Sequence, residues 1–399
     1  PMLAACLLTD EAVTLRNVPD IQDVRVMLEL LQALGVSVES KASTVTLRAT
    51  GIRRTRLDRD LCRRVRASIL LAGPLTVRTG RATVYPPGGD IIGRRRIDTH
   101  MAGLRALGMK VEGGDFYTFR AKSLHGADIL LDEASVTATE NILMAAVLAK
   151  GVTTLYNAAC EPHVQDLGAL LNQMGARITG LGTNLIRVEG VERLHAADHT
   201  IGPDYIEIGS YLCAAAVTGG ELTVHGFSEQ QTRAVMQRTF SKLGLSWKGE
   251  GDQLHQPAHK FFRVKRDLGG AVPKIEDGAW PAFPSDLMSV AIVLATQARG
   301  SMLFFEKMFE SRMYFVDRLI EMGARVVQCD PHRVVVEGPA KLHGIHMSSP
   351  DIRAGMAMLI AALCAKGTSV IENAQVIDRG YERVEERLRG LGAEITREA

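Results

Sequence analysis

Leu34-Gly35-Val36-Ser37-Val38 joins the end of an apolar helical pattern to a strand-like alternation of side chains. Glycine directly after a helix is the usual left-handed stop. The same junction, Leu-Gly or Met-Gly after a helical segment, occurs five more times at similar intervals. The other copies are Leu107-Gly108, Met174-Gly175, Leu243-Gly244, Met322-Gly323 and Leu391-Gly392. Self-similarity of this kind indicates six repeated units.

A second element recurs with the same period, a short helix that is apolar on nearly every face. Its copies span residues 2–8, 67–75, 141–149, 208–218, 287–298 and 354–365. Each is too short to cross a bilayer, and a helix that is apolar all round must be buried. Each unit therefore reads as buried helix, strand, amphipathic helix, strand, strand.

Six such units predict an α/β fold of two similar domains, each with three units, buried helices and outer sheets. We expect the boundary near Pro203-Asp204, which gives an N-terminal domain over 1–203 and a C-terminal domain over 204–399. The alternative, three domains of two units, predicts more linker composition near residues 130 and 270 than the sequence contains.

Composition limits the classes of function that the chain can have. The 399 residues are enough for two or three domains. A net charge of +2 gives no reason to expect a nucleic acid or a membrane as partner. The six cysteines and eleven histidines show no metal-ligand spacing, so we expect free thiols in a reducing compartment and neither metal nor cofactor. The chain opens on proline without a basic leader, so we expect no signal peptide and some residues upstream of Pro1.

The segment 86–100, Pro-Pro-Gly-Gly-Asp-Ile-Ile-Gly-Arg-Arg-Arg-Ile-Asp-Thr-His, is the main candidate for an anion-binding loop. Its glycines let a ligand approach the backbone closely, and its three arginines suit phosphate or carboxylate. Asp90 adds an acid beside them. The Lys-Ser/Thr pair of a nucleotide-triphosphate loop is absent. A solvated basic turn is the alternative interpretation.

Further polar residues occur at equivalent places in the repeats. At the starts of buried helices stand Arg66, Ser135, Thr139, Glu140, Asp204, Glu207, Asp286, Asp351 and Arg353, and in the turns before amphipathic helices stand Arg95, Arg312 and Arg379. The N-termini of parallel helices favour anions. The aspartates could equally be helix caps. Arginine is not a capping residue, so the arginines favour a bound dianion.

With these residues in place, the sequence resembles the UDP-N-acetylglucosamine enolpyruvyl transferases, or 1-carboxyvinyltransferases, nearly from end to end. The most specific motifs are Arg66-Ala67-Ser68, Gly73-Pro74-Leu75, Pro87-Gly88-Gly89 to His100, Ser135-Val136, Ala138-Thr139-Glu140-Asn141, Asn157-Ala158-Ala159-Cys160-Glu161-Pro162, Phe283-Pro284-Ser285-Asp286, Asp351-Ile352-Arg353-Ala354 and Ile377-Asp378-Arg379-Gly380-Tyr381-Glu382-Arg383. The family fold is an inverse α/β barrel of two domains, each of three βαβαββ units, with the active site in the cleft between them.

The resemblance implies a transferase that moves the enolpyruvyl group of phosphoenolpyruvate to the 3-hydroxyl of UDP-N-acetylglucosamine and releases phosphate through a tetrahedral intermediate. This is the first committed step of peptidoglycan synthesis and so serves bacterial cell-wall biogenesis, cell shape and division. It implies a bacterial cytoplasmic location, small-molecule substrates as partners and no cofactor, and it predicts no particular oligomer.

The resemblance also assigns roles to residues. Asp90, Asp286 and Arg379 are the expected catalytic residues, with Asp90 as the acid and Asp286 as the general base that binds the sugar hydroxyl. Arg95, Arg312 and Arg379 are expected to hold phosphoenolpyruvate, with Arg66 and Arg353 nearby. Ser135, Val136, Arg95, Arg96, Ile97 and Asp98 are expected to line the UDP portion. Asp204, Met308 and Asp351 complete the expected substrate-binding set.

The main departure from the family is Asp90, where cysteine is usual. Aspartate is normally ionised at neutral pH and is then a poor acid. Neighbouring arginines favour the ionised form, whereas desolvation and the substrate phosphate favour the protonated form, so we expect an acid only when the loop closes on ligand. Fosfomycin alkylates that cysteine in the family, so a chain with Asp90 is expected to be insensitive.

Other departures keep two alternatives open. The family's Lys-Asn pair would lie just upstream of Pro1, and Thr137, Tyr205 and Trp280 differ from the usual residues. A non-catalytic paralogue that binds a nucleotide sugar is one alternative. The sibling enzyme that acts on shikimate phosphate is the other, although its glycine-rich and Asn-Ala-Gly-Thr segments are missing.

Overall fold

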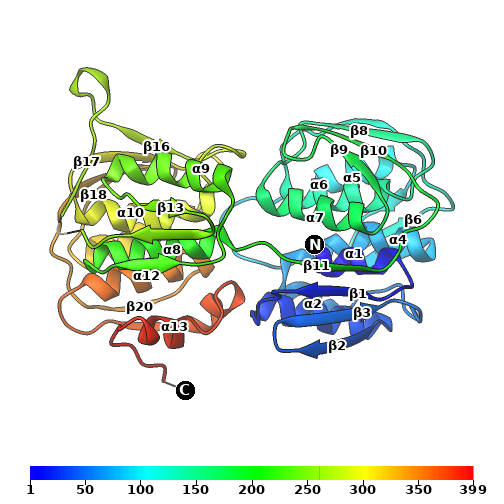
Figure 1. Ribbon diagram of the computed structural model, residues 1–399, viewed down its shortest axis with the longest axis horizontal. Helices are drawn as coiled ribbons and strands as arrows, with labels where there is room; N and C mark the ends of the chain where they lie inside the picture. Colours follow the sequence, from blue (N-terminus) through cyan, green and yellow to red (C-terminus); the bar gives the residue numbers. More distant parts are fainter. Residues whose placement is uncertain (260, 399) are drawn as a thin grey trace. The chain divides into compact units, whose positions relative to one another are not determined.

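The computed structural model describes residues 1–259 and 261–398, and its contacts divide them into two compact units (Figure 1). Unit 1 comprises Pro1–Gly89 and Arg96–Gly202, and unit 2 comprises Asp90–Arg95 and the described residues from Pro203 onward. We expected the whole Asp90 loop to belong with residues 1–203. Its six-residue tip groups with unit 2 instead, because Asp90 pairs with Arg379 and the Arg94 amide donates to Glu310.

Unit 1 has three buried helical segments and three sheets around them. The buried segments are α1 (Met2–Ala5) with the 3₁₀ turn η1 (Cys6–Leu8), η2 (Arg66–Leu71) with α4 (Ala72–Thr79), and α6 (Val136–Ala146). The outer helices are α2 (Gln22–Leu34), α3 (Arg59–Arg64), α5 (Asp98–Ala106) and α7 (Pro162–Gln173). Figure 1 shows α1 and α4 in the interior, with sheet strands on opposite sides of them.

The three sheets of unit 1 have the orders β11-β1-β3-β2, β4-β6-β5 and β7-β8-β10-β9. The first contains β1 (Val13–Arg16), β2 (Ser37–Lys41), β3 (Thr44–Arg48) and β11 (Ala197–Thr200). The second contains β4 (Arg81–Val84), β5 (Lys110–Glu112) and β6 (Tyr117–Arg120), and the third β7 (Asp128–Leu130), β8 (Val152–Tyr156), β9 (Arg177–Thr179) and β10 (Leu185–Glu189). In the first and third sheets a parallel pair joins an antiparallel meander, as the repeat predicts.

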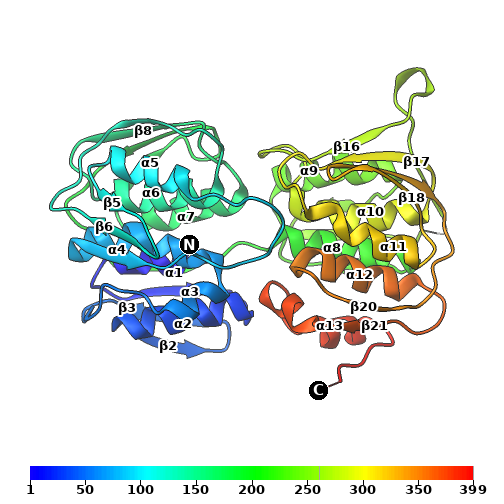
Figure 2. The ribbon, with the colours of Figure 1, turned by 180° about the vertical axis from the view of Figure 1, so that it is seen from behind.

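Unit 2 repeats this plan (Figure 2). Its buried helices are α8 (Tyr205–Val217), α10 (Met288–Gln297) after the turn η5 (Ser285–Leu287), and α12 (Ile352–Cys364). Its outer helices are α9 (Gln230–Phe240) with η3 (Ser241–Leu243), α11 (Val316–Glu321) after η6 (Arg312–Phe315), and α13 (Val384–Gly390) after η7 (Ala374–Arg379). A short turn, η4 (Leu268–Gly270), lies in the connection before α10.

The sheets of unit 2 are less regular. The first, β12-β14-β13, contains β12 (Leu222–Val224), β13 (Lys248–Glu250) and β14 (Gln253–Gln256). The second has the order β15-β17-β19-β18 and adds β16 beside β17; its strands are β15 (Phe262–Arg263), β16 (Lys274–Glu276), β17 (Ala298–Phe305), β18 (Arg325–Asp330) and β19 (Arg333–Gly338). The third contains β20 (His346–Ser348) and β21 (Val370–Glu372). The described residues after α13 form no strand.

The predicted fold class is confirmed. Every residue of α6 from Ala138 to Ala146, and of α10 from Met288 to Thr296, is buried, which is the expected consequence of a helix without a polar face. The six glycines after the outer helices all have a left-handed φ, between 87° and 103°. The repeat read from the sequence is therefore a repeat of backbone conformation as well.

Candidate active site

Asp286 is the centre of the charged cluster of unit 2. It lies in the turn η5 before α10 and accepts hydrogen bonds from Arg312 Nη2 at 2.9 Å and Arg353 Nη2 at 3.1 Å. Burial raises the pKa of Asp286, but the guanidinium groups of Arg353 and Arg312 outweigh it and hold that pKa at about 2. Asp286 is therefore a carboxylate bound by two arginines.

The aspartates at the other two buried helices of unit 2 behave differently. Asp351 caps α12 by accepting from the backbone of Arg353 and Ala354, each at 2.9 Å. Asp204 caps α8 in the same way. The capping interpretation therefore holds for Asp351 and Asp204, whereas Asp286 uses its side chain to bind arginine.

Asp90 and Arg379 form a second ion pair in unit 2. Arg379 Nη1 lies 2.5 Å from Asp90 Oδ1, and the two side chains are only 16% and 13% exposed. Arg379 ends the turn η7, where the sequence predicted an arginine beside a buried helix. Arg379, which was expected to bind phosphoenolpyruvate, therefore pairs with Asp90, the expected acid.

Arg95 and Arg312 lie against the same aromatic ring. Their guanidinium carbons are 5.9 Å and 5.1 Å from the centre of the Phe309 ring, a distance at which cation and ring attract. Burial lowers the pKa of Arg95, while the charges of Asp90 and Asp286 raise it. The structure thus brings Arg95 together with both ion pairs.

Arg353 has a further neighbour that the sequence argument did not single out. The Tyr381 ring is buried, and its centre lies 5.6 Å from the Arg353 guanidinium carbon. The Tyr381 hydroxyl is 2.8 Å from Ser210 Oγ on α8. Tyr381 stands in one of the quoted motifs, two residues after Arg379, which was the available signal. Met308, which was expected to bind substrate, lies shortly before Arg312 in the chain and is 45% exposed.

The remaining expected residues belong to unit 1. Arg66 begins η2 and donates to the backbone carbonyl of Arg96 at 3.0 Å, and Arg96 pairs with Asp98. Ser135 caps α6 by accepting from Ala138 N at 3.4 Å. Val136 is the first residue of α6, and Ile97 lies directly before α5. All of these residues except Arg66 lie at the starts of α5 and α6, whose backbone N–H groups suit anions.

A buried network orients the start of α6. Asn141 Oδ1 accepts from Gly73 N at 2.9 Å, and Asn141 Nδ2 donates to the Ile69 carbonyl at 2.9 Å. Asn141 Nδ2 is also 3.1 Å from His100 Nδ1, so that nitrogen must accept. The other ring nitrogen of His100 then carries the proton and donates to Thr137 Oγ1 at 3.1 Å.

This tautomer agrees with the neutral state of His100, because burial, together with the charge of Arg66, lowers its pKa to about 3. Thr137, which replaces the family's usual glycine, therefore accepts a hydrogen bond and keeps its own proton to donate.

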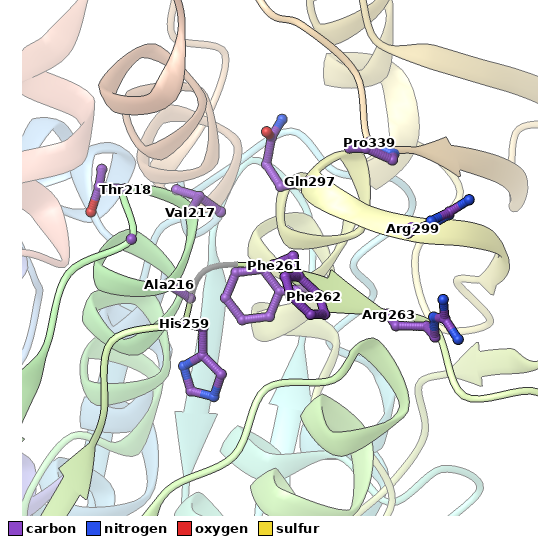
Figure 3. Close-up of a pocket in the computed structure, with 11 residues that line it drawn as sticks. Ala216, Val217, Thr218, His259, Phe261, Phe262, Arg263, Gln297, Arg299 and Pro339 are labelled. Atoms are coloured by element: carbon purple, nitrogen blue, oxygen red, sulfur yellow. The ribbon is translucent and has the colours of Figure 1, made fainter.

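A separate cavity of about 570 Å³ in unit 2 contains none of the expected site residues (Figure 3). It is lined by Ala216, Val217, Thr218, Gly219, His259, Phe261, Phe262, Arg263, Gln297, Arg299 and Pro339. The last residues of α8 and α10 contribute to it, and helix C-termini carry partial negative charge. Arg263 and Arg299 in the lining offset that polarity, but none of the charged residues grouped around Asp286 and Asp90 line the cavity, so we do not place the active site there.

Two further findings concern metals and membranes. Across residues 1–259 and 261–398, no three His, Cys, Asp or Glu side chains are grouped so that they could hold a metal ion. The same residues include no helix with the length and apolar character needed to cross a membrane.

Known proteins resemble this chain in sequence and in fold. The family model described as EPSP synthase (3-phosphoshikimate 1-carboxyvinyltransferase) matches residues 1–388. The chain is similar to the UDP-N-acetylglucosamine 1-carboxyvinyltransferase of Bradyrhizobium diazoefficiens, with 54% identity over 100% of this chain and 92% of that protein. It is similar to the enzyme of the same name from Treponema denticola, with 51% identity over 99% of this chain and 93% of that protein.

Two solved structures share the fold. The enolpyruvyl transferase NikO from Streptomyces tendae has a TM-score of 0.87 and 24% identity, over 99% of this chain and 92% of that chain. An EPSP synthase from Acinetobacter baumannii has a TM-score of 0.73 and 17% identity, over 99% of this chain and 95% of that chain.

Proposed function

Because the chain belongs to the EPSP synthase family of carboxyvinyltransferases, and within it to the UDP-N-acetylglucosamine 1-carboxyvinyltransferases, we propose that it transfers the enolpyruvyl group of phosphoenolpyruvate to UDP-N-acetylglucosamine. The 3-hydroxyl of the sugar is the acceptor, and phosphate is the second product. The reaction makes a peptidoglycan precursor, and we propose that it takes place in the bacterial cytoplasm. The relatives at 46% to 54% identity carry this name, whereas the shikimate activity is named only by the broader family model and by solved structures at 17% identity.

The observation that carries the proposal is the pairing of Asp286 with two arginines instead of a helix N-terminus. A carboxylate between Arg312 and Arg353 stays charged but is a weak base. The phosphate and carboxylate of phosphoenolpyruvate compete for the same guanidinium groups, because arginine binds both anions through planar forks. Substrate binding thereby weakens the hold on Asp286 and makes it a stronger base for the sugar hydroxyl.

The Asp90–Arg379 pair concerns the acid that protonates phosphoenolpyruvate. When the phosphate of the donor takes Arg379, Asp90 loses its cationic partner, which favours its protonated form. In the addition step, the sugar oxygen bonds to C2 of phosphoenolpyruvate, Asp286 takes the hydroxyl proton, and Asp90 gives a proton to the methylene carbon. In the elimination step, that carbon returns a proton to the Asp90 carboxylate, the C2–O bond to phosphate breaks, and the departing phosphate takes the proton from Asp286.

The other expected residues complete the proposal. Arg95, Arg312, Arg353 and Arg379 bind the donor, and Asp351, Asp204 and Met308 are the proposed substrate contacts of unit 2. Ser135, Val136, Arg66, Arg96, Ile97 and Asp98 of unit 1 bind the UDP portion. The units are proposed to be two domains of three repeats, 1–203 and 204–399.

The proposal is tested by release of phosphate with each substrate alone and with both together. We expect turnover only with both, and an Asp286→Asn variant to lose about 10²- to 10⁴-fold in kcat, the usual contribution of general acid–base catalysis. Asp198→Asn, which removes an exposed partner of Arg16, is the matched control and should keep full activity. Binding of the nucleotide sugar without any turnover would instead identify a non-catalytic paralogue, and turnover with shikimate 3-phosphate would identify the sibling activity.

A further inference from the structure

Two fully buried carboxyl groups meet directly behind the Asp286 site. Glu306 follows β17 and Asp277 follows β16, and these strands pair in parallel with Glu276 opposite Phe305. The next residue of each strand is therefore a carboxylic acid at the same position along the pair. Both are 0% exposed. The sequence argument missed them, because their meeting depends on a strand pairing that no local pattern specifies.

The carboxyl group of Glu306 connects three parts of the site. Ser285 Oγ, next to Asp286 in the chain, lies 2.9 Å from both of its oxygens. The backbone amides of Met308 and Phe309 donate to Oε1 at 3.3 and 3.2 Å. Arg312 Nε lies 3.9 Å from Oε2 and has no hydrogen-bond partner within the described chain. Glu306 is therefore a hub between the base, the substrate loop and a donor-binding arginine.

Asp277 holds the same loop from the other side. Its Oδ1 accepts from Lys307 N at 2.5 Å and its Oδ2 from Met308 N at 3.3 Å. Two neighbouring carboxylates without solvent cannot both be charged at a tolerable cost. Burial raises the pKa of Glu306 well above its usual range, and the hydrogen bond and charge of Asp277 raise it further. A protonated Glu306 that donates to Asp277 satisfies both groups and leaves one negative charge.

We propose that Glu306 and Asp277 are positioning residues for the transfer reaction, which share one proton and use their single charge to hold the Met308–Phe309 backbone and the Arg312 guanidinium in place. This inference rests on the proposed function. With one charge, the pair attracts Arg312 Nε weakly enough for Nη2 to stay on Asp286. With two charges, it draws Arg312 away from Asp286 and from the donor.

Other charged groups near Glu306 could also change the pH dependence, so the experiment needs a control variant. Asp286 and Arg312 face its side chain from η5 and η6. His332, between β18 and β19, contacts the Glu306 backbone carbonyl through Nδ1 at 2.7 Å. Lys307 turns outward to Glu276, at 3.8 Å. His332 contributes the imidazole of this group, so a His332→Asn variant separates its effect from that of the pair.

The test is the pH dependence of kcat/KM for phosphoenolpyruvate. Wild type should lose activity on the alkaline side as the pair gives up its proton. Glu306→Gln and Asp277→Asn each leave one carboxylate and no shared proton, so both should lose the alkaline limb, and their kcat/KM should fall less than that of the double variant. The double variant has no charge to hold Arg312 and should lose about tenfold or more in kcat/KM at every pH. His332→Asn should keep the wild-type limb.

A direct measurement protects the test against variants that fold poorly. The infrared difference spectrum between wild type and Glu306→Gln at neutral pH should show the carbonyl stretch of a protonated carboxylic acid that only wild type has, because the band of Glu140, whose pKa is about 7, is common to both and cancels. The proposal is overturned if that band is absent, or if the single and double variants reproduce the wild-type pH profile and kcat/KM. If wild type itself releases no phosphate with both substrates, the proposed function fails, and the infrared result still decides whether the pair shares a proton.

Discussion

At the scale of single residues, Asp90 has two opposing demands on its carboxyl group. In the structure it pairs with Arg379, a residue 289 positions away in the chain. That contact favours a carboxylate, whereas the proposed reaction needs an acid. The two states follow one another if the donor's phosphate displaces Asp90 from Arg379. Arg379 thus holds Asp90 in the resting enzyme and releases it when phosphoenolpyruvate binds.

This arrangement predicts the response to an epoxide inhibitor. Wild type should form no covalent adduct with fosfomycin, because an ion-paired carboxylate is a much weaker nucleophile than a thiolate. Asp90→Cys should gain a time-dependent adduct at residue 90, because nearby arginines favour the thiolate. Peptide mass spectrometry measures both results. The exposed Cys329 is an internal control for unspecific alkylation, and an adduct on Asp90 of wild type would contradict the prediction.

At the scale of elements, the glycines that end the outer helices differ in what surrounds them. Gly35 and Gly392 have nearly the same left-handed φ, 102° and 101°. A Cβ on Gly35 would lie 2.3 Å from the carbonyl oxygen of Gly51, whereas a Cβ on Gly392 would meet nothing within 4 Å. Gly35 is therefore required by its left-handed backbone and by the lack of space for a Cβ, whereas Gly392 is required by its backbone alone.

Alanine at these two positions separates strain from collision. Gly392→Ala should cost only backbone strain, about 1 kcal/mol or somewhat more. Gly35→Ala should cost more than about 3 kcal/mol, because the backbone near Gly51 must also move. Urea denaturation of the two variants beside wild type measures the difference. Equal losses would show that the contact with Gly51 relaxes without cost.

The elements also show what could be read from the sequence. The buried helices and the glycine stops were predictable, because each depends on residues close together in the chain. Asn17, Asn157 and Asn373 form a further repeat with φ between 55° and 59°, each donating from its side chain to a backbone carbonyl. That repeat was overlooked, because a single asparagine after a strand is not distinctive without the left-handed conformation.

The site was less predictable than the fold for a physical reason. Asp286, Asp204 and Asp351 look alike in sequence, and only their contacts distinguish an arginine-bound carboxylate from two helix caps. The Glu306–Asp277 pair depends on the β16–β17 register. These roles depend on contacts between residues far apart in the chain. Sequence patterns could therefore indicate candidate site residues but could not show which of them bind arginine.

At the scale of the whole molecule, the small net charge conceals two buried groups of unit 1 that respond to acid in opposite directions. Burial lowers the pKa of His100 to about 3, so the unfolded chain takes up that proton first, and stability is lost as the pH falls from about 6.5 toward 3. Burial raises the pKa of Glu140 to about 7, so the folded chain takes up that proton first, and stability is gained as the pH falls from about 7 to 4.5. Their contributions largely cancel between pH 6.5 and 4.5.

Single variants should expose this cancellation. Relative to wild type, His100→Gln should become more stable as the pH falls, by about 2 kcal/mol between pH 6.5 and 5. Glu140→Gln has no buried charge and should be more stable than wild type at the upper end of this range. That difference in stability should shrink as the pH falls, because Glu140 of wild type becomes protonated. Hydrogen exchange of the α5 and α6 amides measures the local stability of unit 1. Both tryptophans, Trp247 and Trp280, lie in unit 2, so their fluorescence should report an unfolding transition that neither variant shifts. A parallel pH response of His100→Gln and wild type in α6 would contradict the lowered pKa of His100 in the folded chain.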